Sequence, residues 1–176
     1  LAIIIVNYNG QNFLPQCLDS VRLLNSSSHK FHTFIVDNHS SDSSLELISK
    51  HYSDMTLLPQ KANLGFAQGN NVGISKALQQ NFDAVMLLNN DTKVDPNLAV
   101  NLLSASADLV SPKIYFYPHF EFHHDRYRDQ DRGKVIWYAG GAIDWNNVLG
   151  VHRGVDKVDT GQFDQPQNLE FATGCC

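Results

Sequence analysis

Short apolar runs alternate with segments in which apolar residues recur every three or four positions. The apolar runs, which predict strands, cover 2–6, 34–36, 55–58 and 84–88. Four helices are predicted between and after these runs. The first, after a cap at Asn12, carries Leu14, Cys17, Leu18 and Val21 at helical spacing, and the second, which opens at 40–42, carries Leu45, Ile48 and Tyr52. The third covers 67–80, and the fourth begins at Asp95-Pro96. This alternation predicts an α/β fold: a mostly parallel sheet with helices on both faces.

The run Ala84–Leu88 is apolar throughout and then ends abruptly in Asn89-Asn90-Asp91-Thr92. A continuous apolar run predicts a strand that is buried on both faces of a parallel sheet. Polar groups at its carboxyl end stand where open α/β sheets bind ligands, and Asp91 offers a hard oxygen ligand for Mg²⁺ or Mn²⁺. The same four residues are also typical of a simple turn or helix cap.

The pattern changes after Asp108. Strands are expected at 109–116, 134–139 and 169–172, and a long loop rich in His, Asp and Arg at 117–133. We expect one domain over 1–176, with a regular α/β half at 1–108 and an irregular, β-rich half at 109–176. The start without Met and the apolar end at Cys175-Cys176 lead us to expect a piece of a longer protein, so membrane attachment through other parts stays open.

Composition narrows the function classes. Apolar residues make up 43% and charged residues 18%, as in globular proteins, and the net charge of -5 argues against a nucleic-acid binder. The three cysteines give no disulfide framework and no paired zinc spacing, which favours a reducing, cytoplasmic setting. No run has the length of a transmembrane helix.

Three predicted strand ends carry clustered polar side chains, at 7–9, 37–40 and 89–92. The carboxyl ends of parallel strands share one edge of a sheet, so these clusters should converge. Amides and carboxylates suit the edges of a nucleotide base and the ribose hydroxyls. Capping explains any one cluster but explains all three together less well.

Glycines at 65, 69 and 73 are spaced for close packing of a helix on the sheet, and Gly65 allows the backbone to approach a ligand. The segment lacks both G-x-G-x-x-G and a Walker A loop. A second cluster combines histidines with aspartates in the 117–133 loop. A metal site is conceivable there, but a solvated loop is favoured because the spacing fits no rigid site; its members are His119, His123, His124, Asp125, Asp129 and Asp131.

The ordered motifs resemble family-2 inverting glycosyltransferases with the GT-A fold, especially the bacterial rhamnosyltransferase-like branch. They are Val6-Asn7-Tyr8-Asn9, the run 36–42, Asn63-Leu64-Gly65-Phe66-Ala67 with 69–73, Leu88-Asn89-Asn90-Asp91-Thr92, the run 137–141 and the run 171–175. The resemblance covers nearly the whole chain. It implies transfer of a sugar from a dTDP-, UDP- or GDP-linked donor to a glycan or lipid-linked acceptor in polysaccharide biosynthesis, at the inner face of the membrane.

The resemblance also implies site residues. Donor binding falls to Asn7, Asn9, Asp37, Asn63, Gly65, Asn70, Asn89, Asn90 and Asp91. Asp91 is the one carboxylate of a D-x-D-type metal motif in which Asn89 replaces the first acid, and the expected metal is Mg²⁺ or Mn²⁺. The family's catalytic base lies downstream of 173–175, so we assign none; Asp144 and Asp156 are carboxylates without a sequence-based place in the site.

Two alternatives remain open. One is a non-catalytic nucleotide-sugar-binding module, because no base is assigned. The other is a nucleotidyltransferase on a similar sheet, which ranks lower since 7–14 contains no basic residue.

Overall fold

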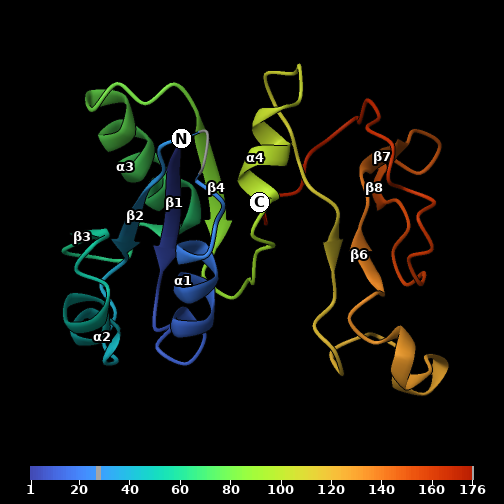
Figure 1. Ribbon diagram of the computed structural model, residues 1–176, viewed down its shortest axis with the longest axis horizontal. Helices are drawn as coiled ribbons and strands as arrows, with labels where there is room; N and C mark the ends of the chain where they lie inside the picture. Colours follow the sequence, from blue (N-terminus) through green and yellow to red (C-terminus); the bar gives the residue numbers. More distant parts are fainter. Residues whose placement is uncertain (27–28, 176) are drawn as a thin grey trace. The chain divides into compact units, whose positions relative to one another are not determined.

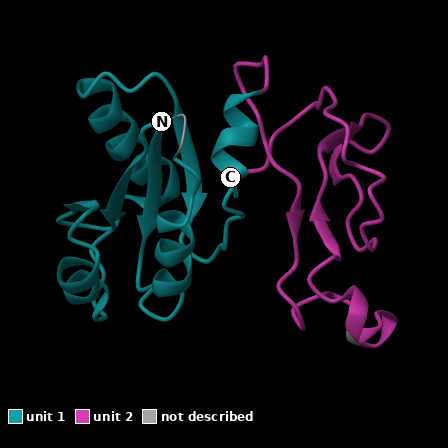
Figure 2. Ribbon diagram, viewed as in Figure 1, with its two compact units in different colours: residues 1–104, 175–176 teal, residues 105–174 magenta. Residues whose placement is uncertain are grey.

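The computed structural model describes residues 1–26 and 29–175. It divides the chain into two compact units (Figure 2). Unit 1 contains residues 1–104 and Cys175, and unit 2 contains residues 105–174. The change of unit falls four residues before the change of pattern seen in the sequence.

Unit 1 is built on four parallel strands, β1 (Ala2–Asn7), β2 (His32–Asp37), β3 (Thr56–Pro59) and β4 (Val85–Asn89). Their order across the sheet is β3-β2-β1-β4 (Figure 1). The register pairs Asn7 with Asp37 and Val6 with Asn89, so the three polar strand ends lie level with one another. The predicted parallel sheet is confirmed.

The helices of unit 1 are α1 (Leu14–Arg22), α2 (Ser44–His51), α3 (Gly65–Gln79) and α4 (Leu98–Leu103). Pro15 occupies the first turn of α1, where its missing N–H costs nothing. Alternate β1 side chains serve two layers: Ile3 and Ile5 pack with α1, α2 and α4, whereas Ile4 faces α3. The expected helices on both faces are present.

Close packing of α3 explains two of its glycines. A Cβ at position 73 would stand 2.4 Å from Ile4 Cγ2, and one at position 69 would stand 2.9 Å from Val6 Cγ1. A side chain at either position would have to displace the Ile4 or Val6 side chain of β1, which confirms the predicted packing role. Gly65, the first residue of α3, has open space around its Cβ position but a φ of +76°, a conformation that favours glycine.

Strand β4 differs from the prediction of burial on both faces. Met86 and Leu88 are buried, but Val85 and Leu87 are only half-buried. β4 is the last strand in the order of the described sheet, whereas the central β1 is buried almost throughout. An apolar run therefore indicated a strand correctly but not its place in the sheet.

Unit 2 contains short strands: β5 (Ile114–Tyr115), β6 (Ile136–Tyr138), β7 (Gly141–Asp144) and β8 (Leu149–His152). β5 pairs with β6, and β7 forms an antiparallel hairpin with β8. The strand expected at 109–116 shrinks to two residues, and the one at 169–172 is a single bridge between Phe171 and Gly141. Two 3-10 turns, His124–Arg126 and Asp129–Asp131, interrupt the predicted loop. In the described part of the chain no helix has the length and apolarity needed to cross a bilayer.

Candidate nucleotide-binding edge of the sheet

Asn7 joins the three strand ends. Its Nδ2 donates to Asp37 Oδ2 at 2.8 Å and to Ser40 Oγ at 3.1 Å. Its Oδ1 accepts from Asn90 Nδ2 at 2.8 Å. The side chain is 0% exposed. The sheet thus brings Asn7, Asp37 and Asn90 together, with Asn7 as a buried link between β2 and β4.

Asp37 is also 0% exposed, and both of its carboxylate oxygens are occupied. Oδ1 accepts from Ser40 N at 2.9 Å, and Oδ2 accepts from Ser40 Oγ at 2.7 Å as well as from Asn7. A buried carboxylate is tolerated only with such donors. Asp37 therefore stabilises the edge of the sheet by holding Asn7 and Ser40 together.

Gly10 makes the link possible. A Cβ at this position would lie 2.3 Å from Asn7 Oδ1 and 2.3 Å from Asn90 Nδ2. The two amides are hydrogen-bonded to each other at that point, so neither moves away without breaking the bond. The chain must lack a side chain where it turns over this pair.

Asn9 connects the β1–α1 loop to the β2–α2 loop. Its backbone N–H donates to Ser40 Oγ at 2.9 Å, and its Oδ1 accepts from Ser41 N at 2.8 Å. Asn9 and His39 both have positive φ values, 52° and 68°. Left-handed non-glycine residues are uncommon and gather at functional loops. Here they turn two neighbouring strand ends sharply away from the sheet.

Asp42 holds the same two loops together farther out. It accepts from Gln11 N at 3.0 Å and from Ser44 N at 3.0 Å at the start of α2. Partial burial alone would raise the pKa of Asp42, but hydrogen bonds from Ser44 and Gln11 outweigh it and lower that pKa.

The start of α3 is attached through Asn38, whose Nδ2 donates to Gly65 O at 3.0 Å. Asn63 is exposed, and its Oδ1 accepts from Gly65 N at 2.9 Å. Asn63 and Gly65 thus border the end of β2. Asn70 is buried, and its Nδ2 donates to Phe66 O one turn earlier in α3.

Asn89 lies between two cysteines. Its carbonyl accepts from Thr92 Oγ1 at 2.8 Å and from Cys17 Sγ at 3.5 Å. Its backbone N–H donates to Cys175 O at 3.2 Å, and its Nδ2 donates to Cys175 Sγ at 3.4 Å. Burial raises the pKa of the Cys17 thiol to about 11, so that thiol is neutral near pH 7. Burial first, and then the charge of Asp91, raise the pKa of the half-buried Cys175.

Asp91 is exposed beside this segment. Its carboxylate accepts no hydrogen bond from residues 1–26 or 29–175, and neither do the side-chain oxygens of Asn89 and Asn90, whose amide nitrogens are engaged. Oxygen ligands of this kind suit Mg²⁺ or Mn²⁺. No group of three or more His, Cys, Asp or Glu side chains is arranged to hold a metal within the described residues. Asp91 is the one carboxylate that the segment 89–92 contributes to this edge of the sheet.

The donor-binding residues implied by the family resemblance omit three contributors to this edge. Ser40 and Gly10 lie against the network around Asn7, Ser40 being half-buried, and Tyr8 is 52% exposed at the end of β1. The three-residue spacing of Asp37 and Ser40 is a sequence signal, because aspartate commonly accepts from a backbone N–H a few residues on. For Gly10 the chain gives no such signal, since the clash involves Asn90 from a distant segment.

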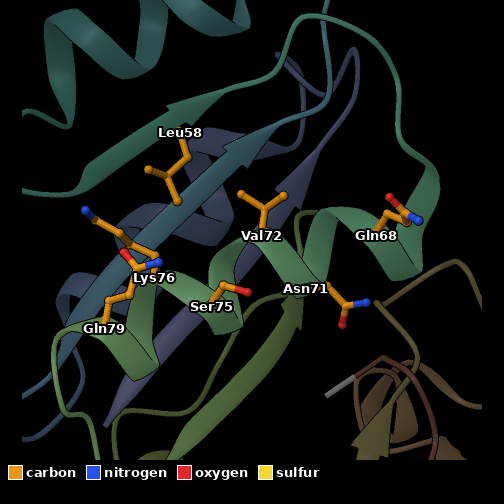
Figure 3. Close-up of a pocket in the computed structure, with 7 residues that line it drawn as sticks. All are labelled: Leu58, Gln68, Asn71, Val72, Ser75, Lys76 and Gln79. Atoms are coloured by element: carbon orange, nitrogen blue, oxygen red, sulfur yellow. The ribbon is translucent and has the colours of Figure 1, made fainter.

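A pocket of about 490 Å³ lies elsewhere on unit 1, beside α3 (Figure 3). Figure 3 shows Leu58 of β3 facing the α3 side chains that complete the lining: Gln68, Asn71, Val72, Ser75, Lys76 and Gln79. None of the donor-binding residues inferred from the sequence lines it. The polar residues at the strand ends and this pocket are therefore separate features of unit 1.

The polar loop of unit 2 is occupied by ion pairs. Asp156 accepts from Arg126 at 2.9 Å and lies 3.3 Å from His123, while Asp131 pairs with Arg128 and Asp129 with Arg132. The side chain of His124, like Cys176, lies outside the described residues. A hydrogen bond from Asn147 lowers the pKa of Asp144. The two carboxylates to which the sequence assigned no role, Asp144 and Asp156, therefore accept hydrogen bonds from other residues of unit 2.

Two solved structures share the fold of this chain. The chain is similar to S. aureus TarS 1-349 in complex with UDP, at 18% identity and a TM-score of 0.52, over 58% of this chain and 30% of that one. It is also similar to the mannosyltransferase PcManGT from Pyrobaculum calidifontis in complex with GDP-Man and Mn²⁺, at 18% identity and a TM-score of 0.52, over 67% of this chain and 35% of that one. No curated protein matches the chain.

The similar region thus spans about a third of each of those solved chains. The shared architecture is the GT-A fold, which confirms the predicted fold class. The sequence pattern of the family described as glycosyl transferase family 2 matches residues 2–171, almost the whole chain. The chain belongs to glycosyl transferase family 2.

Proposed function

We propose that this chain is the donor-binding part of a glycosyltransferase that uses a nucleotide-diphospho-sugar. The observation that carries the proposal is the buried Asn7 link, which holds the ends of β1, β2 and β4 together with Asp91 at the rim. TarS binds UDP and PcManGT binds GDP-Man with Mn²⁺ on the same fold, which supports the ligand class.

The exposed groups have chemistry that suits such a donor. The face of Tyr8 offers a stacking surface for a base, and nearby amides match its hydrogen-bonding edge. Asp91, with the side-chain oxygens of Asn89 and Asn90, would hold Mg²⁺ or Mn²⁺ near the diphosphate. A bound divalent ion would supply charge neutralisation for the departing diphosphate.

In the proposed reaction, the acceptor oxygen forms a bond to the anomeric carbon while the bond from that carbon to the diphosphate oxygen breaks. The acceptor proton passes to a base, and the anomeric centre inverts. The family resemblance supports inversion and, within the family, a rhamnosyl or other hexosyl donor such as dTDP-rhamnose. A glycan or lipid-linked acceptor in polysaccharide biosynthesis, at the cytoplasmic face of a membrane, completes the proposal.

Calorimetric titration with UDP, GDP and dTDP, each with and without Mn²⁺, tests the donor site. We expect saturable binding of at least one nucleotide that strengthens with Mn²⁺, and loss of the Mn²⁺-dependent part in Asp91→Ala. Absence of binding by all three nucleotides would refute a donor site. Metal dependence that survives in Asp91→Ala would remove Asp91 from the metal site.

A further inference from the structure

Cys175 brings a distant part of the chain against the segment that carries Asp91. The polypeptide passes through all of unit 2 and then returns to unit 1 at this residue. Its carbonyl accepts from Asn89 N at 3.2 Å, and its thiol contacts Asn89 Nδ2 at 3.4 Å. Both the backbone and the side chain of Asn89 are therefore held by one residue that is 86 positions away in sequence.

Two hydrogen bonds make this contact. Asn89 Nδ2 donates to the Cys175 sulfur, which is a weak acceptor and leaves Asn89 Oδ1 unengaged, and Asn89 N donates to the Cys175 carbonyl. The other side of Asn89 is fixed by Cys17 and Thr92, which donate to its carbonyl. Asn89 is thus hydrogen-bonded on both sides, and Asp91 follows it by two residues.

From this geometry we infer that Cys175 is a positioning residue for the proposed metal site. It orders Asn89, and through Asn89 it sets the place of Asp91 and of the free amide oxygens beside it. The inference rests on the proposed function for its ligand, but the ordering itself is a property of the free protein. Cys175 need not touch the metal or the nucleotide to act in this way.

The test compares Cys175→Ala, which removes the side-chain bond, with Cys175→Ser, which keeps a group that donates and accepts. A net hydrogen bond is worth about 1 kcal/mol, which corresponds to about a fivefold change in an equilibrium constant. We expect Cys175→Ala to raise the apparent Kd for Mn²⁺ about fivefold, measured with the nucleotide that binds best, and Cys175→Ser to restore most of the affinity. Nucleotide affinity without Mn²⁺ should stay the same in both variants.

Amide hydrogen exchange on the ligand-free protein provides the second measurement. Cys175→Ala should speed exchange at residues 89–92 about fivefold, whereas Ser53→Ala, a change at an exposed turn position of unit 1, should leave it unaltered. Unchanged exchange at 89–92 in Cys175→Ala would overturn the inference, even if no nucleotide binds. Wild-type protein that binds no nucleotide but shows the exchange effect would refute the donor site alone.

An equal loss of Mn²⁺ affinity in Cys175→Ala and Cys175→Ser would also overturn the inference. That result would mean that the volume of the sulfur matters and its hydrogen bond does not. Full rescue by serine separates positioning from simple packing.

Discussion

Two groups of polar residues share the carboxyl edge of the unit 1 sheet, yet they differ in what they are able to contact. The inner group, Asn7, Asp37, Ser40 and Asn90, is hydrogen-bonded within itself, and Asn7 and Asp37 are fully buried. The outer group, Tyr8, Asn63 and Asp91, is exposed. The inner group determines where the strand ends stand, although Asn90 uses only its amide nitrogen there and keeps its side-chain oxygen for a ligand. The outer group is exposed and available to a ligand.

This difference changes the meaning of the motif residues. The resemblance to the family implied donor contact for Asn7 and Asp37 and for Asp91 alike. The side chains of Asn7 and Asp37 are hydrogen-bonded to each other, to Ser40 and, through Asn7 Oδ1, to Asn90. The carboxylate of Asp91 accepts no hydrogen bond from the described residues. We therefore expect the same Asp→Asn substitution to lower stability in the inner group and to lower metal-dependent ligand binding, with little change in stability, in the outer group.

The largest effect is expected from Asp37→Asn. An amide has one nitrogen, so whichever way it turns, a donor faces Asn7 Nδ2 or Ser40 N with no water between. Loss of a charged, buried hydrogen-bond acceptor should lower the free energy of unfolding by about 2–4 kcal/mol. Urea denaturation measures the loss. A cost under about 1 kcal/mol would show that the inner group is not a stabilising network.

The second effect is expected from Gly10→Ala, with Gly73→Ala as its matched control. Each added methyl lies within 2.4 Å of a neighbour, at Asn7 and Asn90 in one case and at Ile4 in the other. Both should cost about 1–3 kcal/mol of stability through overpacking. Only Gly10→Ala should also weaken nucleotide binding, about tenfold, because it separates the amides that join β1 and β4. Equal binding by the two variants would contradict the assignment of the inner group to the site.

The sequence was sufficient to predict the parallel sheet, its four helices and the convergence of the strand ends. The reason is that the spacing of apolar residues along a short segment reflects which face of a strand or helix is buried. Whether a strand is central or terminal depends on which strand pairs with it, so the half-burial of Val85 and Leu87 was not predictable. The strand expected at 169–172 was reduced to one bridge for a similar reason, since strand length depends on a partner that the chain alone does not reveal.

The division of the site into inner and outer residues was also beyond the sequence. Asn7 and Asn9 are the same residue type two positions apart, yet one is buried and the other exposed because the chain turns at Asn9 with a positive φ. Ser40 and Gly10 matter through contacts with segments that are distant in sequence. The types of side chain at the strand ends were enough to predict the edge of the sheet. Only the tertiary contacts show which of these residues are buried in the network and which are exposed.

The smallest effect on stability is expected from Asp91→Asn, the same chemical change as Asp37→Asn on the outer side of the comparison. Asp91 is exposed and accepts no hydrogen bond from residues 1–26 or 29–175, so the free energy of unfolding should change by less than about 0.5 kcal/mol. In wild-type protein, Mn²⁺ with a bound nucleotide should raise the Tm, because a ligand that binds only the folded state stabilises it. That Mn²⁺-dependent rise should disappear in Asp91→Asn while the Tm without metal stays unchanged. A loss of intrinsic stability as large as that of Asp37→Asn would place Asp91 in the inner group. The distinction between residues that stabilise the edge of the sheet and residues that bind a ligand there would then be wrong.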